Sequence, residues 1–156
     1  ILTQSIAQTD NLKWRTFIAS NLYGPHDHFN SSKSHLIAAI IFKVLEARKL
    51  GLKSISMWGD GTPKREFTYV EDFANWISEK IEDLSDLPPI LNVGYGEDFT
   101  VRQYYELVSA MAGVDIEIIS DPSKPSGNKR KLMDSSLAQK YGWEPFTPIN
   151  RGMPKL

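Results

Sequence analysis

The stretch Trp58-Gly-Asp-Gly-Thr-Pro-Lys-Arg-Glu-Phe-Thr-Tyr-Val-Glu-Asp72 decides how the rest of the chain is interpreted. It follows an apolar run, turns through two glycines and a proline, and continues as the alternating segment Glu66-Phe-Thr-Tyr-Val70. This pattern predicts a strand, a Gly/Pro loop and a second strand. Trp58 is suited to stacking on a flat ring, and Arg65, beside Lys64, to binding phosphate oxygens. The residues leave open a second interpretation, a β-hairpin with a solvated basic tip.

The flanking sequence predicts strands that alternate with helices, which is typical of an α/β chain. We expect helices over 1–11, 35–50, 71–84, 100–112 and 135–141, and strands over 15–20, 55–57, 66–70, 90–94 and 115–119. Ser34 is a candidate N-cap for the second helix and Gly51 its stop. Thr100 with Gln103 predicts a capping box. The segment Asn21-Leu-Tyr-Gly-Pro25 is expected to interrupt the chain sharply after the first strand.

The composition of the chain argues against several classes of protein. The chain has 156 residues, 41% hydrophobic and 24% charged, which is typical of a globular domain. A net charge of −1 argues against nucleic acid binding through bulk charge. The chain has no cysteine, which excludes disulfides and thiolate chemistry and is compatible with a cytoplasmic protein. No apolar run approaches a membrane span, so no membrane partner is predicted. The chain starts at Ile1 in a helical pattern, and we expect it to be part of a longer protein.

Two further motifs do not predict a site by themselves. The glycine pairs Gly59/Gly61 and Gly94/Gly96 lack the third glycine of the dinucleotide-binding fingerprint, so we expect turns there. The three histidines, His26, His28 and His35, lack the spacing and the cysteine partners of a metal centre, and no metal is predicted. No Ser–His–Asp or Cys–His arrangement indicates nucleophilic catalysis.

Several motifs in order along nearly the whole chain carry a family resemblance. They are Asn21-Leu-Tyr-Gly-Pro-His-Asp27, Ser34-His35, Trp58-Gly-Asp-Gly-Thr-Pro-Lys-Arg-Glu-Phe67, Asn92-Val-Gly94, Ser123-Lys-Pro-Ser-Gly127, Arg130-Lys-Leu132 with Asp134, and Gly142-Trp143. Together they resemble the extended short-chain dehydrogenase/reductase family of nucleotide-sugar epimerases and dehydratases. The Trp-Gly-x-Gly-Thr-Pro and Ser-Lys-Pro motifs are similar to those of its GDP-L-fucose synthase branch.

The resemblance implies a fold and a domain organisation. The chain is expected to be the C-terminal, substrate-binding half of a Rossmann-type α/β fold, without the N-terminal cofactor-binding half. Residues 1–33 would be the tail of the cofactor domain and 34–156 mainly the substrate domain, with 66–95 returning to the Rossmann sheet. The family's cofactor loop and catalytic Tyr-x-x-x-Lys pair would precede Ile1, so this chain by itself is expected to be inactive. The resemblance further implies NADP as cofactor and a homodimer of the full-length protein.

The resemblance also implies roles for individual residues. His35 corresponds to the general acid of epimerisation and contributes to cofactor binding together with Asn21 and Leu22. The substrate contacts implied are Asn21, Leu36, Ile40, Lys43, Trp58, Arg65 and Lys124. Arg65 would hold the diphosphate and Lys124 the nucleotide side. Lys43 stands where the family has an arginine, and this change loses bidentate geometry.

The function implied is binding of a GDP-sugar by an NADP-dependent epimerase/reductase that acts on a GDP-4-keto-6-deoxy sugar. One alternative is a relative that acts on another GDP-sugar, such as a deoxyheptose, by reduction or epimerisation only. The other is a non-catalytic module that binds a nucleotide-sugar. An upstream glycine-rich loop and Tyr-x-x-x-Lys pair in the reading frame would favour the enzyme.

Overall fold

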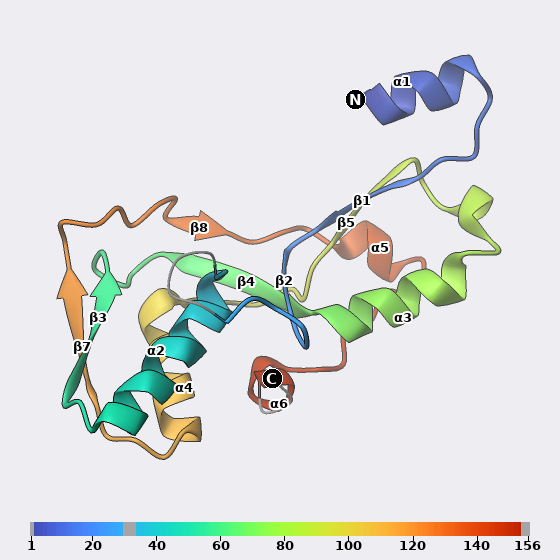
Figure 1. Ribbon diagram of the computed structural model, residues 1–156. Helices are drawn as coiled ribbons and strands as arrows, with labels where there is room; N and C mark the ends of the chain where they lie inside the picture. Colours follow the sequence, from blue (N-terminus) through green and yellow to red (C-terminus); the bar gives the residue numbers. More distant parts are fainter. Residues whose placement is uncertain (1, 30–33, 154–156) are drawn as a thin grey trace.

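A computed structural model describes residues 2–29 and 34–153 (Figure 1). The helices are α1 Leu2–Thr9, α2 Leu36–Leu50, α3 Val70–Lys80, the 3₁₀ helix η1 Leu84–Asp86, α4 Val101–Met111, α5 Ser136–Gln139 and α6 Ile149–Gly152. The strands are β1 Thr16–Ala19, β2 Asn21–Tyr23, β3 Ser54–Trp58, β4 Lys64–Tyr69, β5 Ile90–Val93, β6 Asp98–Thr100, β7 Glu117–Asp121 and β8 Arg130–Lys131. The α/β class expected from the sequence is confirmed.

Strand β4, which lies within the stretch 58–72, has three strand neighbours. Its second half pairs in parallel with β2, and its first half pairs with β6 antiparallel and β8 parallel. The preceding strand β3 instead pairs in parallel with β7, at a distance from β4 (Figure 1). The β-hairpin interpretation is therefore wrong, because the Gly/Pro loop passes the chain from one sheet to another.

The predicted alternation of buried and exposed residues along β4 is also wrong. All four residues from Glu66 to Tyr69 are buried. Phe67 and Tyr69 lie in the core, whereas Thr68, on the opposite face, shares a hydrogen bond of 2.7 Å with the hydroxyl of Ser20. A strand covered on both faces loses the two-residue period that marks a strand with one solvated face.

The segment expected to interrupt the chain begins with a strand. Asn21 to Tyr23 form β2, in register with Phe67 to Tyr69, and the turn comes only at Gly24. A Cβ atom at Gly24 would lie 2.2 Å from Cγ1 of Val70, so this close approach requires glycine. The partner strand that makes Asn21–Tyr23 extended lies 46 residues away in the register, which local sequence does not reveal.

Helix ends follow the local signals closely in two cases. Gly51 ends α2 with φ of 65°, and the Thr100–Gln103 capping box at α4 is present, so both predictions are confirmed. At the start of α2 the N-cap is His35, because the Ser34 hydroxyl donates a hydrogen bond to the carbonyl of His28 instead. Two boundaries differ from the prediction, since α3 ends at Lys80 and β7 starts two residues later than expected. Three short elements, β6, β8 and α6, were not predicted.

Two clusters of buried side chains hold the fold together. The larger joins α2 and α4 to β3 and β4, and α2 and α4 lie side by side (Figure 1). The smaller lies around α3, β5 and α5, where the rings of Trp76 and Trp143 meet edge to face at 5.6 Å. Burying such a ring contributes about 1.5–3 kcal/mol through removal of apolar surface from water. The larger cluster, which contains Phe67 and Tyr69, sets the position of β4.

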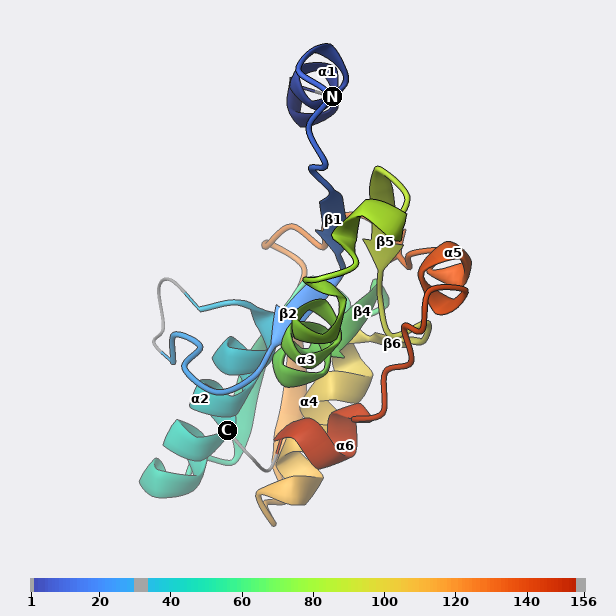
Figure 2. The same cartoon turned by 90° about the vertical axis from the view of Figure 1, so that its right-hand side faces the viewer.

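One end of the molecule is less packed. Helix α1 has no buried residue and projects away from the rest (Figure 2). Strands β1 and β5 form a separate parallel pair, and Ile18 in β1 is 45% exposed. The division at residue 33 and the return of 66–95 to a Rossmann sheet stay predictions. Within the described residues, no helix has the length and apolarity needed to cross a membrane.

Candidate functional site

A cavity of about 270 Å³ lies where β2, the start of α2 and β4 meet. Its lining consists of Asn21, Leu22, His35, Leu36, Arg65 and Phe67. Five of these six residues were singled out in the sequence, although they come from three separate segments of the chain. The register of β2 against β4 brings Asn21 opposite Phe67, and α2 packs over that pair of strands through the core. The tertiary structure therefore brings five of the predicted residues together around one cavity.

Asn21 and His35 both line this cavity, from β2 and from the start of α2. The Asn21 side-chain amide donates a hydrogen bond of 2.9 Å to the carbonyl of Glu66, which fixes its orientation on β4. His35 is exposed at the N-cap of α2, where its carbonyl accepts from the N–H of Ala39 at 2.8 Å. The imidazole itself makes no capping hydrogen bond. It is thus available for proton transfer to a ligand in the cavity.

Arg65 is half-buried, and its guanidinium is held by backbone oxygens. Nη1 donates to the carbonyl of Lys64 at 2.7 Å and to the carbonyl of Asn128 at 2.6 Å. Neither acceptor carries a charge, so the guanidinium keeps its full positive charge beside the cavity. An arginine presented in this way is suited to binding phosphate oxygens.

A second group of residues gathers around the exposed ring of Trp58 at the end of β3. The Nζ atoms of Lys43 and Lys124 each lie 5.9 Å from the centre of this ring. Lys43 also donates to the carbonyl of Ser56 at 3.0 Å and to the hydroxyl of Tyr105 at 3.4 Å. In the described part of the chain, neither lysine has a carboxylate within 4 Å. Two cations beside a flat, 58% exposed ring favour an aromatic ligand that carries negative charge.

Burial changes the acid–base properties of this second group. Partial burial lowers the pKa of Lys43, because desolvation disfavours its charged form. Burial also raises the pKa of Tyr105 to about 12, so its phenol stays protonated and can accept the lysine N–H through its oxygen. An anionic ligand beside Lys43 would offset the cost of desolvation and favour the charged ammonium.

The loop over residues 122–129, hereafter the 122–129 loop, links the two groups. It starts beside Gly59, whose N–H donates to the carbonyl of Asp121 at 2.8 Å. A Cβ at Gly59 would lie 2.2 Å from the Ser126 hydroxyl oxygen, which shows how closely the loop passes the end of β3. At its other end, the N–H of Lys64 donates to the carbonyl of Lys129 at 2.8 Å. The loop therefore runs from Trp58 to Arg65.

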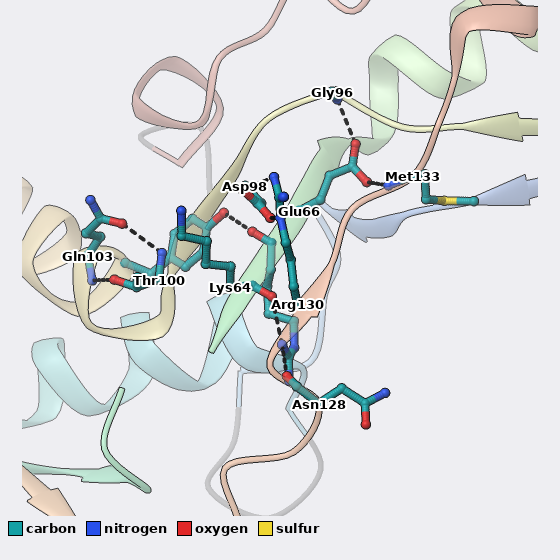
Figure 3. Close-up of polar contacts among 11 residues, drawn as sticks. Lys64, Glu66, Gly96, Asp98, Thr100, Gln103, Asn128, Arg130 and Met133 are labelled. Carbon is teal, nitrogen blue, oxygen red and sulfur yellow. Dashed lines mark hydrogen bonds and ion pairs between the residues drawn. The ribbon is translucent and has the colours of Figure 1, made fainter. Parts of the chain in front are cut away.

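A buried carboxylate holds the far side of β4 (Figure 3). Glu66 is 1% exposed and accepts the N–H groups of Gly96 at 2.7 Å and Met133 at 3.0 Å, from two different connecting segments. A Cβ at Gly94 would meet the same carboxylate at 2.4 Å. Glu66 therefore ties β4, the strand that carries Arg65, to the two connecting segments that contain Gly96 and Met133. Sequence reasoning did not single out Glu66, because its two donors lie 30 and 67 residues further along the chain.

The structure separates some residues that the sequence grouped together. Ile40 is fully buried in the core and exposes no surface to the cavity, so its contact with a nucleotide-sugar stays a prediction. Lys43, Trp58 and Lys124 belong to the second group rather than to the cavity lining. Phe67 and Tyr105 were missed as site residues, and only the spacing of aromatic residues along their elements could have suggested them. The described residues contain no cluster of three or more potential metal ligands.

A family profile and individual known proteins that resemble this chain indicate the same family. The sequence profile described as the NAD dependent epimerase/dehydratase family matches residues 1–94. A GDP-L-fucose synthase of Azorhizobium caulinodans is 39% identical over 152 residues, which is 97% of this chain and 49% of that protein. A GDP-L-colitose synthase of Yersinia pseudotuberculosis is 36% identical over 148 residues, 95% of this chain and 48% of that protein.

Solved structures agree on the fold. A GDP-6-OMe-4-keto-L-xylo-heptose reductase from C. jejuni superimposes with a TM-score of 0.88 at 21% identity, over 99% of this chain and 55% of that one. At this identity the likeness concerns the fold. The chain spans about half the length of the curated relatives it matches.

Proposed function

Because this chain belongs to the NAD dependent epimerase/dehydratase family, we propose that it is the GDP-sugar-binding half of an NADP-dependent epimerase/reductase. The substrate proposed is a GDP-4-keto-6-deoxy sugar. The single observation that carries the proposal is the convergence of Asn21, His35 and Arg65 on one cavity. A proton donor, an amide and a cation are the groups that a keto-sugar diphosphate requires.

The two groups of residues match the two parts of such a substrate. A GDP-sugar has a flat base, two charged phosphates and a neutral sugar, and it needs aromatic or apolar walls with local cations. The base would lie against Trp58, with Lys43 and Lys124 near the charge that follows it. Arg65, which lines the cavity, would hold the diphosphate. The sugar would enter the cavity, whose volume of about 270 Å³ suits one sugar ring rather than a whole nucleotide.

His35 is proposed as the acid of epimerisation. A histidine side chain can act as a general acid, giving a proton to the carbon face of an enediolate and recovering one from solvent. Its place at the start of α2, exposed and without a capping bond, supports this role. Leu36 follows directly and contributes an apolar wall.

The bound cofactor would contact the cavity at Asn21 and Leu22. Both residues follow β1, and in open α/β sheets ligands bind at the carboxyl ends of the strands. When bound, the nicotinamide would supply the hydride that reduces the sugar ketone. The cavity has room for only part of a dinucleotide. We propose that the remainder of its site belongs to a half that precedes this chain and lies beside β1 and β5. The choice of NADP over NAD rests on the resemblance to the fucose synthase branch.

Two alternative functions differ from this proposal, one in its substrate and the other in lacking catalysis. A colitose synthase among the relatives and a heptose reductase of the same fold favour a different GDP-sugar as substrate, because the names of both proteins specify other sugars. A non-catalytic nucleotide-sugar-binding module is favoured only if the full-length protein lacks a Tyr-x-x-x-Lys pair and a cofactor loop.

The decisive experiment assays the full-length protein with NADPH against a panel of GDP-4-keto sugars, including 6-deoxy and heptose forms. NADPH oxidation with the 6-deoxy substrate and formation of the C3- and C5-inverted product are expected. Preference for a heptose substrate would replace the first proposal with the first alternative. This 156-residue chain assayed separately is expected to show no NADPH oxidation, and measurable turnover by it would contradict the division into halves.

A further inference from the structure

The guanidinium of Arg65 has one nitrogen fully engaged and two nitrogens open. Both hydrogen bonds to the carbonyls of Lys64 and Asn128 come from Nη1, which has two N–H groups. Among the described residues, no acceptor lies at Nε or Nη2. In a guanidinium, the Nε–H and one Nη2–H point in the same direction and match two oxygens of a carboxylate or phosphate. The backbone has therefore left one bidentate edge of Arg65 for a ligand.

Gly127 lies directly against this open edge. Its φ is +71°, a conformation that side chains rarely adopt, and a Cβ at Gly127 would lie 3.1 Å from Nη2 of Arg65. A side chain here would make a tight contact, and Nη2 of Arg65 would have to move by a few tenths of an ångström to make room. Glycine at this position thus satisfies two requirements at once, the backbone turn and the access to Nη2.

The carbonyl of Asn128 is itself held at a defined position. The next residue, Lys129, accepts the N–H of Lys64 at 2.8 Å, and β8 then pairs with β4 in the register Lys64 to Arg130. The side chain of Asn128 points away from the bond to Arg65 (Figure 3), so the backbone oxygen alone makes the contact. The 122–129 loop therefore ends in a rigid acceptor for Nη1.

We propose that Gly127 and the carbonyl of Asn128 are positioning groups that present the Nε and Nη2 edge of Arg65 to the ligand diphosphate. The inference rests on the proposed function, in which Arg65 binds that diphosphate. It adds that the strength of binding depends on a residue that touches only Arg65. Any side chain at position 127 should then weaken ligand binding, including one that tolerates the backbone conformation of Gly127.

The test is a double-mutant cycle on GDP binding by the full-length protein, measured by isothermal titration calorimetry. Gly127→Asn adds a Cβ while tolerating a positive φ, and Arg65→Lys keeps the charge while removing the bidentate edge. In the otherwise unchanged protein, Arg65→Lys should weaken GDP binding about tenfold, the loss expected from one charge-assisted hydrogen bond. In the Gly127→Asn background the same change should cost about twofold or less, because the added side chain already disturbs that edge.

Gly113→Asn is the matched control. Gly113 has φ of +66° and no atom within 4 Å of its Cβ position, so this variant has similar backbone strain without a neighbour. It should bind GDP like the unchanged protein, and thermal unfolding of every variant checks the fold. A full tenfold loss from Arg65→Lys in both backgrounds would overturn this inference while the proposed function stands. No GDP binding by the unchanged protein, or no loss from Arg65→Lys in it, would overturn the proposed function and with it this inference.

Discussion

The carboxylate of Asp98 accepts two hydrogen bonds from the guanidinium of Arg130, from Nε at 2.5 Å and from Nη2 at 3.2 Å (Figure 3). Asp98 starts β6 and Arg130 starts β8, and both strands pair with the first residues of β4. They must therefore lie on opposite edges of β4, so this ion pair crosses over the strand that carries Arg65. It anchors the end of the 122–129 loop.

This pair predicts a pH dependence of stability. The hydrogen bonds from Arg130 hold the pKa of Asp98 below its ordinary value of 3.8. A lowered folded-state pKa stabilises the protein above the unfolded-state value, and the stabilisation is lost as the pH falls through the folded-state value. Asp98→Asn should reduce the dependence of Tm on pH below about pH 5, measured by circular dichroism. Asp10→Asn, at an exposed site, is the control and should leave that dependence unchanged.

Arg65 and its neighbour Lys64 should differ strongly in ligand binding. Arg65 lines the cavity, whereas Lys64 is exposed and absent from the lining. Arg65→Ala in the full-length protein should raise KM or Kd for the GDP-sugar by one to two decades, since a charged hydrogen bond contributes about 1.5–3 kcal/mol. Lys64→Ala is the matched control and should change it little. Equal losses in both variants would indicate a diffuse basic patch.

His35 should affect proton exchange more than binding. His35→Gln in the full-length protein should nearly abolish exchange of the acidic C–H protons of the sugar with deuterated water, because the amide cannot supply a proton. Nucleotide-sugar affinity should change little, since the diphosphate contacts are retained. Mass spectrometry of the substrate follows the exchange. Exchange at the unchanged rate, or loss of binding alone, would exclude His35 as the acid and weaken the epimerase assignment.

Glu66 should be important for stability. Glu66→Gln replaces one acceptor oxygen by an NH₂ group, which would face the N–H of Gly96 or of Met133 without forming a hydrogen bond. We expect a loss of about 1.5–3 kcal/mol in the free energy of unfolding, because hydrogen bonds to a buried charge are lost. Urea unfolding measures it. Glu79→Gln, on the exposed side of α3, should be within about 0.5 kcal/mol of the unchanged protein.

Tyr23 and Gly152 form a close contact that a pair of substitutions can test. The Tyr23 hydroxyl is buried and has no hydrogen-bond partner in the described part of the chain, and a Cβ at Gly152 would lie 2.1 Å from it. Gly152→Ala should therefore destabilise by about 1–3 kcal/mol through overpacking. Tyr23→Phe should be neutral or slightly stabilising, since it removes an unsatisfied polar group.

The double variant of Tyr23→Phe with Gly152→Ala should recover part of the loss caused by Gly152→Ala, because the colliding oxygen is gone. Urea unfolding of all four proteins gives the coupling between the two sites. If the two effects are simply additive, the contact between the added methyl group at position 152 and the Tyr23 ring is relieved in another way, for example by movement of α6.

The sequence by itself determined the features that depend on residues a few positions apart. The capping box at Thr100, the end of α2 at Gly51 and the α/β alternation all rest on contacts within one or two turns. The motifs around Asn21, His35 and Arg65 also identified the family before any geometry was known. Local hydrogen bonds and backbone preferences are sufficient for these predictions.

Only the tertiary structure decided which segments lie together. The second half of β4 pairs with β2, Arg65 is held by a carbonyl 63 residues further on, and Lys43 lies beside Trp58 and Lys124 rather than beside Arg65. These contacts join distant segments, and the pairing of β4 with β2 forms because β4 is covered on both faces and its backbone groups need partners. No local pattern of residues specifies those partners, since they are set by the packing of the whole core.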